Sequence, residues 1–317
     1  MVKIAQLIKL QDYISRYEWD TYRYPTQYIR VKKDNWDKLY QKWVESQSDK
    51  LVQQTNNNQL ENNEKTFLSK WKSFIRNEST KIETEHYEEE NVVELPDTEM
   101  ELKQYFLDKI FRFQLKWATS TVTNISLVDQ AYYEDPLLQY LLQRFPDTFL
   151  LLYYPSFNIK HAPMDAEIIM ISPLGIEILY FVEKGKDAII MAGNERTWTV
   201  ETPDKQTRML SPVIALKRTE SVVKSILHKF EIDFPIKKKV LSRTNQIIYH
   251  TEPYHTEIIG KHDYLDWFNK QRSLSSPLKN RQLKTADVLL KHCQSNSVKR
   301  SEWENDTSYT RIGDMEE

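Results

Sequence analysis

The sequence predicts an α/β fold preceded by a mainly helical region, and two observations support this. Amphipathic helical patterns alternate with short apolar runs of strand length, in the order helix, strands, helix, strands. Three of the 5 glycines, Gly175, Gly185 and Gly193, fall in one short region, where they mark tight turns between strands. So few glycines also exclude the glycine-rich phosphate-binding loops of Rossmann and P-loop proteins.

The composition is that of a folded protein without a strong charge preference. The chain has 317 residues, of which 40% are hydrophobic and 28% charged, and its formal net charge is −2. This length fits one large domain or two ordinary ones. The near-neutral balance argues against generic phosphate binding over the whole surface, so any basic nucleic-acid site must be local.

The use of cysteine and the pattern of apolar residues indicate the cellular compartment in which the protein is expected. Cys293 is the single cysteine, which excludes an intrachain disulfide and a multi-cysteine metal site and is typical of a reducing compartment. Gln6 and Lys9 interrupt the first apolar stretch, and nowhere do roughly 18 apolar residues follow without interruption. We expect a cytoplasmic, soluble protein with no membrane partner and no small-molecule cofactor.

The N-terminal residues are expected to lie outside the α/β domain. Residues 1–50 are rich in aromatic and basic side chains and predict a pair of amphipathic helices, near residues 13–17 and 36–43. A stacking surface for single-stranded nucleic acid is the alternative interpretation. Residues 51–97 read as a polar and acidic linker with a short helix near residues 67–75. A capping box then opens an amphipathic helix within residues 98–129.

Residues 130–272 carry the α/β pattern. A helix follows Pro136, and a second begins at Ser211 and Pro212. Strands are expected at residues 148–155, 166–172, 176–182, 187–193, 237–242 and 246–250, those from 166 to 193 pairing antiparallel in succession. The three lysines at 237–239 are typical of a protected sheet edge. A helix is expected near residues 262–270, and residues 273–317 should form a C-terminal helix and, from 294, a frayed tail.

One stretch resembles a known family. Asp165-Ala-Glu167, an apolar strand, the turn from Ser172 to Gly175 and a second apolar strand are similar to the nuclease-related domain (NERD) family, of the PD-(D/E)xK nuclease-like superfamily. The resemblance covers about residues 130–270 and implies a central mixed sheet flanked by helices. In active members an acid before the turn and an E-x-K triplet after it bind Mg²⁺ and orient water. It implies that Asp165 or Glu167 supplies that first acid and metal ligand, and that Glu134 corresponds to a further helix carboxylate.

The triplet itself departs from the family pattern. In register with the turn, Tyr180 and Val182 take the positions of its Glu and Lys. Lys184 shares their strand face and is the remaining cation at the edge of the site. We therefore expect a degenerate active centre and a role as a nucleic-acid-associated or protein-interaction module. The alternative is an active Mg²⁺-dependent nuclease in which Glu183 and Lys186 have taken over the catalytic roles through a bulge between them.

Overall fold

The computed structural model describes residues 3–56, 95–159, 162–193, 196–251, 253 and 255–300. The chain divides into two compact units, one comprising Met1–Lys32 with Leu107–Glu317 and the other Lys33–Phe106. The expected domain boundaries at residues 50, 97, 130 and 272 stay a prediction, and within this division β1 (Gln6–Leu10) and the helix at Asn280–Lys291 both belong to the unit that holds the central sheet.

A six-stranded mixed sheet forms the centre of the larger unit, which confirms the α/β class. Its strand order, β1-β3-β6-β7-β11-β13, is also the order along the chain, and β6 alone of these six runs antiparallel to the others. The strands are Gln6–Leu10 (β1), Leu150–Tyr153 (β3), Ile168–Ser172 (β6), Gly175–Phe181 (β7), Ile236–Leu241 (β11) and Thr256–Ile259 (β13). Most of their residues are buried, as expected for a sheet covered on both faces.

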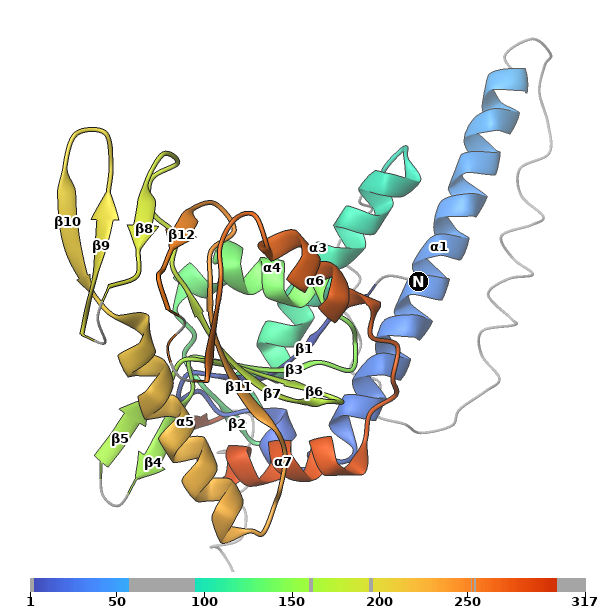
Figure 1. Ribbon diagram of the computed structural model, residues 1–317. Coiled ribbons are helices and arrows are strands. Elements are labelled where there is room, and N and C mark those ends of the chain that lie inside the picture. Colours follow the sequence, from blue (N-terminus) through green and yellow to red (C-terminus); the bar gives the residue numbers. More distant parts are fainter. Residues whose placement is uncertain are drawn as a thin grey trace, which may run out of the picture. The chain divides into compact units, whose positions relative to one another are not determined.

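Helices cover both faces of this sheet (Figure 1). α4 (Pro136–Arg144) and α6 (Tyr264–Ser273) pack on one face, where their apolar side chains share a core cluster with Leu151, Ile168 and Leu179. α5 (Pro212–Lys229) and α7 (Asn280–Lys291) lie on the other face. α3 (Glu99–Trp117) begins in the smaller unit, and its C-terminal half joins the α4 side of the core.

A second sheet has four strands, of which three follow one another along the chain and the fourth, β12, comes after α5 and β11. Its order is β10-β9-β8-β12, with bounds Ile189–Met191 (β8), Thr197–Glu201 (β9), Gln206–Leu210 (β10) and Gln246–Ile248 (β12). β8 was expected to pair antiparallel after β7, and this expectation is wrong, because β8 pairs with β9 and β12 instead. The remaining strands form two antiparallel two-stranded sheets. One pairs β4 (Ser156–Ile159) with β5 (Ala162–Asp165), and the other pairs β2 (Asn124–Ile125) with β14 (Val298–Lys299).

The N-terminal expectation of a helix at residues 13–17 is wrong. The chain instead forms β1, an edge strand of the central sheet, followed by the 3₁₀ turn η1 (Arg16–Glu18). The long helix α1 (Tyr24–Asn56) includes the predicted helix at 36–43 and continues past residue 50 into the expected linker. The short helix predicted at residues 67–75 lies outside the described residues.

Two further expectations are wrong, the edge-protecting role of the lysines at 237–239 and the frayed tail from residue 294. β11 lies between β7 and β13, so its lysines do not protect an edge. Lys238 and Lys239 are buried and ion-paired, with Glu220 at 2.5 Å and Glu257 at 2.8 Å. The segment from 294 to 300 is not frayed, since it forms β14 and backbone hydrogen bonds to the core.

Across the described ranges, none of the helices combines the length and apolar character that crossing a membrane requires.

Candidate functional site

A polar cleft lies where β5 ends and β6 begins. Its volume is about 360 Å³, and it contains both acids that the resemblance points to, Asp165 and Glu167. The residues that line it are Gln11, Asp12, Tyr154, Ser156, Asp165, Ala166, Glu167 and Arg218. They come from the end of β1, the β3–β4 connection, the β5–β6 connection and α5. We take this cleft as the candidate site.

Backbone contacts fix the two acids in the cleft. Asp165 pairs with Ser156 in the β4–β5 ladder, and the Ser156 hydroxyl donates a hydrogen bond to Asp165 Oδ1. Arg218 Nη2 donates to the Asp165 carbonyl oxygen at 3.1 Å. The backbone N–H of Glu167 donates to Thr219 Oγ1 on α5 at 3.0 Å. α5 therefore positions both the acids and the cation of the cleft.

Glu167 faces a tyrosine across the β6–β7 hairpin. Ser172 pairs with Gly175 and Ile168 with Leu179, so continuing the ladder by one pair places Glu167 opposite Tyr180. Burial raises the pKa of Glu167, and the Arg218 guanidinium partly offsets this. Burial also raises the pKa of Tyr180, and the Glu167 carboxylate adds to that shift. The phenol thus stays neutral beside the carboxylate at physiological pH.

The neighbouring triplet position holds an apolar residue. Val182 is 2% exposed, and its backbone N–H donates to the Leu241 carbonyl oxygen at 2.9 Å. Together, Tyr180 and Val182 bring a phenol and an isopropyl group to the strand face that carries Glu167. Neither group provides a carboxylate ligand or a positive charge.

The other predicted site residues lie away from the cleft. Lys184 and Lys186 are exposed beyond the end of β7. Glu183 accepts three hydrogen bonds from Arg243, at 2.5 Å from Nε, 2.7 Å from Nη2 and 3.4 Å from the backbone N–H. Those hydrogen bonds hold the pKa of Glu183 below its usual range. Glu134 is exposed at the end of η2 (Gln130–Tyr133). The structure therefore brings Asp165 and Glu167 together and leaves these four outside the cleft.

Sequence reasoning missed most of the cleft wall. Arg218 sits on a helix that was predicted, but nothing in its spacing indicated which strand it would contact. Tyr154 lies half-buried directly after β3, and burial, then the Glu167 carboxylate, raises the pKa of its phenol. Its backbone φ of 46° is in the left-handed region, unusual for a tyrosine, which marks a sharp change of direction at the cleft. Asp12 was not considered because the strand before it was missed.

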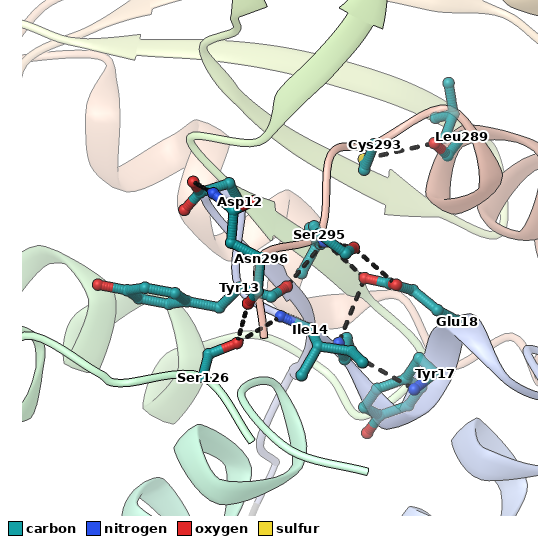
Figure 2. A network of polar contacts seen from close by, with 12 residues as sticks. Asp12, Tyr13, Ile14, Tyr17, Glu18, Ser126, Leu289, Cys293, Ser295 and Asn296 are labelled. Atoms are coloured by element: carbon teal, nitrogen blue, oxygen red, sulfur yellow. Dashed lines mark hydrogen bonds and ion pairs between the residues drawn. The ribbon is translucent and has the colours of Figure 1, made fainter. Parts of the chain in front are cut away.

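The C-terminal segment braces the Asp12 side of the cleft (Figure 2). Asn296 Nδ2 donates to Asp12 Oδ2 at 2.5 Å, and the Asn296 backbone N–H donates to the Asp12 carbonyl oxygen at 2.7 Å. Ser126 Oγ donates to the Asn296 carbonyl oxygen at 2.6 Å, and Ser295 Oγ donates to Glu18 Oε2 at 2.7 Å. The Asp12 carboxylate thus accepts a hydrogen bond from the Asn296 side chain, and the other contacts hold the segment that carries Asn296 in place.

The acidic side chains of the described residues are not gathered into a cluster of metal ligands. Within the described residues, no group of three or more His, Cys, Asp or Glu side chains is placed to hold a metal. Mg²⁺ in proteins is commonly held by one or two carboxylates together with water or phosphate oxygens, and in this cleft Asp12 and Asp165 already accept hydrogen bonds from Asn296 and Ser156.

Comparisons with known proteins do not establish a family. No protein-family model matches the chain, and no solved structure matches it significantly. The curated protein named RNA 2',3'-cyclic phosphodiesterase, from Geobacillus stearothermophilus, is 48% identical to it over 40 residues. That match covers 13% of this chain and 13% of that protein, which is too short to assign a shared fold or activity.

Proposed function

We propose that this chain is a nuclease-like protein related to the NERD family, that its active centre is catalytically degenerate, and that the cleft binds a protein partner. One observation carries the proposal. Tyr180 stands opposite Glu167, and Val182 is buried, at the positions where metal-dependent hydrolysis needs a carboxylate and an ammonium group.

The order of elements supports the relation to this family. The resemblance implies a helix, a strand, the central hairpin, another strand, a helix and a strand, and α4, β3, β6, β7, β8, α5 and β11 occur in that order, with β4, β5, β9 and β10 as additional strands. The turn between β6 and β7 is formed at Pro173 and Leu174, as the resemblance requires. Asp165 ends β5 and Glu167 directly precedes β6, so both lie just before the strand that leads to the turn, where the resemblance implies the first acid.

The charges of the cleft favour a basic partner. Three carboxylates, from Asp12, Asp165 and Glu167, face one guanidinium, from Arg218. Without a metal ion such a cleft repels phosphate groups and attracts a segment that carries Lys or Arg. We therefore favour a protein partner over nucleic acid.

A cleavage assay tests the degenerate centre. The full chain is incubated with supercoiled plasmid, single-stranded DNA and single-stranded RNA, in Mg²⁺ or Mn²⁺. We expect no metal-dependent cleavage, with wild type and Asp165→Ala giving the same background. Cleavage that Asp165→Ala abolishes would instead establish the active Mg²⁺-dependent nuclease.

A binding assay tests the partner chemistry. Fluorescence anisotropy compares a labelled Lys- and Arg-rich decapeptide with a labelled RNA of similar size. Replacing two acids, Asp165→Asn with Glu167→Gln, should weaken peptide binding about five-fold, at about 0.5 kcal/mol for each ion pair. Glu183→Gln lies outside the cleft and serves as the matched control, with no change expected. If RNA binds more tightly than the peptide and the double variant strengthens it, the protein is nucleic-acid-associated and our assignment of the partner is wrong.

A further inference from the structure

The polar cleft at Glu167 lies at the carboxyl ends of two parallel strands. β1 and β3 pair in parallel, and the residues that directly follow them, Gln11 and Tyr154, both line the cleft. Both have a positive φ, 42° and 46° respectively. In open α/β sheets ligands bind outside the carboxyl ends of the strands, and left-handed non-glycine residues gather at binding sites. The cleft therefore has the position and the backbone of a binding site.

The carboxylates of the cleft keep acceptor atoms that the protein does not use. Asp12 accepts a hydrogen bond at Oδ2 and Asp165 accepts one at Oδ1. The second oxygen of each has no partner in the part of the chain that the structure describes. Neither oxygen of Glu167 accepts a hydrogen bond from a described residue, and neither is among the buried atoms without a partner. Four carboxylate oxygens thus remain for a donor that enters the cleft.

The cation in the cleft wall does not fill this role. Arg218 Nη2 donates to the Asp165 backbone carbonyl oxygen at 3.1 Å, and among the described residues Arg218 forms no ion pair with Glu167. Burial raises the pKa of Glu167 even though the Arg218 guanidinium lowers it in part. The Glu167 carboxylate therefore gains from a further cation.

A guanidinium group fits these acceptors better than an ammonium group does. It carries five N–H donors in a planar fork that matches carboxylates, whereas an ammonium group is a compact point charge with three donors. Tyr154 lines the same cleft, and a guanidinium packs on an aromatic ring by a cation–π contact. Elsewhere in this unit the guanidinium carbon of Arg243 already lies 4.7 Å from the ring centre of Tyr140.

We propose that the partner of this cleft inserts an arginine side chain, whose guanidinium group binds the Glu167 and Asp165 carboxylates and packs on the Tyr154 ring. This inference rests on the proposed function, a basic protein partner, and adds the side chain that the cleft recognises. Tyr154 is the residue that determines the preference for arginine over lysine.

Three matched peptides test the preference on the full chain. They are labelled decapeptides of one sequence, in which every cationic position is arginine, lysine or citrulline. Citrulline has the shape of arginine without its charge. In fluorescence anisotropy we expect the arginine peptide to bind the wild type about ten-fold more tightly than the lysine peptide, because of the fork and the ring contact. The citrulline peptide should bind more weakly than either.

Variants of Tyr154 test the residue that sets the preference. Tyr154→Leu removes the ring and should reduce the ratio of the two affinities to about two-fold, whereas Tyr154→Phe keeps the ring and should retain it. Tyr22→Leu is the matched control, since Tyr22 is 45% exposed and does not line the cleft. If Tyr154→Leu does not fold, the peptide comparison on the wild type still decides the proposal.

The outcomes separate this inference from the proposed function. Equal affinities for the arginine and lysine peptides, or a citrulline peptide that binds as tightly as arginine, would overturn the inference and leave the basic partner in place. An arginine preference that persists in Tyr154→Leu would refute the role of Tyr154. If none of the three peptides binds, the proposed function itself fails.

Discussion

Replacing Lys9, the buried lysine of β1, should reduce the free energy of unfolding much more than replacing an exposed lysine does. Lys9 is 0% exposed, yet all three of its N–H donors are used. Its Nζ donates to the Tyr13 carbonyl oxygen at 2.7 Å, to Glu18 Oε1 at 2.5 Å and to Ser295 Oγ at 2.7 Å. Lys9→Met keeps the unbranched stem and removes only these contacts, which leaves the Glu18 carboxylate without its cation.

The structure sets the expected magnitude. Removing one member of a buried ion pair costs about 3–5 kcal/mol. The Glu18 side chain is 21% exposed, so water partly compensates its charge, and we expect a loss near the lower end, about 3 kcal/mol. The double variant Lys9→Met with Glu18→Gln should recover about 1–2 kcal/mol of this, because no uncompensated charge remains.

Urea unfolding followed by tryptophan fluorescence measures both values. The matched control is Lys103→Met, which removes the exposed i,i+4 pair with Glu99 at 2.7 Å and should cost no more than about 0.5 kcal/mol. If Lys9→Met costs no more than this control, or if the double variant is less stable than the single one, our account of the network is incorrect.

Three further predictions concern other parts of the larger unit. Gly175→Ala should destabilise the protein by about 1–3 kcal/mol, because an added Cβ would lie 2.7 Å from a carbonyl oxygen, whereas Gly185→Ala, with nothing within 4 Å, should be neutral in the same denaturation assay. The hydrogen bonds from Arg243 lower the pKa of Glu183 in the folded state, so the stability it contributes is present above the unfolded pKa of about 4.3 and is lost as the pH falls through the folded value. Unfolding midpoints between pH 5 and pH 3 should therefore fall more steeply for the wild type than for Glu183→Gln. Burial raises the pKa of the Cys293 thiol to about 12, so a thiol-reactive chromophore at pH 8 should label it only after unfolding.

A specific result would contradict each of these three predictions. Equal stabilities of the two glycine variants would mean that the turn relaxes without strain. Parallel pH profiles of the wild type and Glu183→Gln would mean that the carboxylate gains nothing from its guanidinium partner. Labelling of the native thiol within minutes would mean that the segment around it opens readily.

The central hairpin was predictable because its signals are local. Two apolar runs flank Pro173, Leu174 and Gly175, and the observed pairing of Ser172 with Gly175 follows from that turn. The acids at 165 and 167 were found for the same reason, since they stand next to the strand in sequence. The positions of β6 and β7 agree with the expected strands to within two residues.

β1 and the cleft wall were not predictable, because their causes are distant in sequence. Gln6 and Lys9 made the first stretch look too polar for a buried strand, yet Gln6 Nε2 donates to carbonyl oxygens of Pro25 and Asp147. Polar residues at such positions are tolerated only where the fold supplies partners. Arg218 likewise reaches the cleft only because α5 packs along the sheet, which helical periodicity alone does not specify.

The agreement between strand order in the sheet and strand order in the chain has a consequence for synthesis. Since β1, β3, β6, β7, β11 and β13 follow the same sequence in both, each new strand leaves the ribosome when the neighbour it needs has already been made. No strand has to be threaded between two that are already joined. Translation delivers about 5–20 residues per second, so the sheet can widen at one side in step with elongation, and Thr256–Ile259 closes it last.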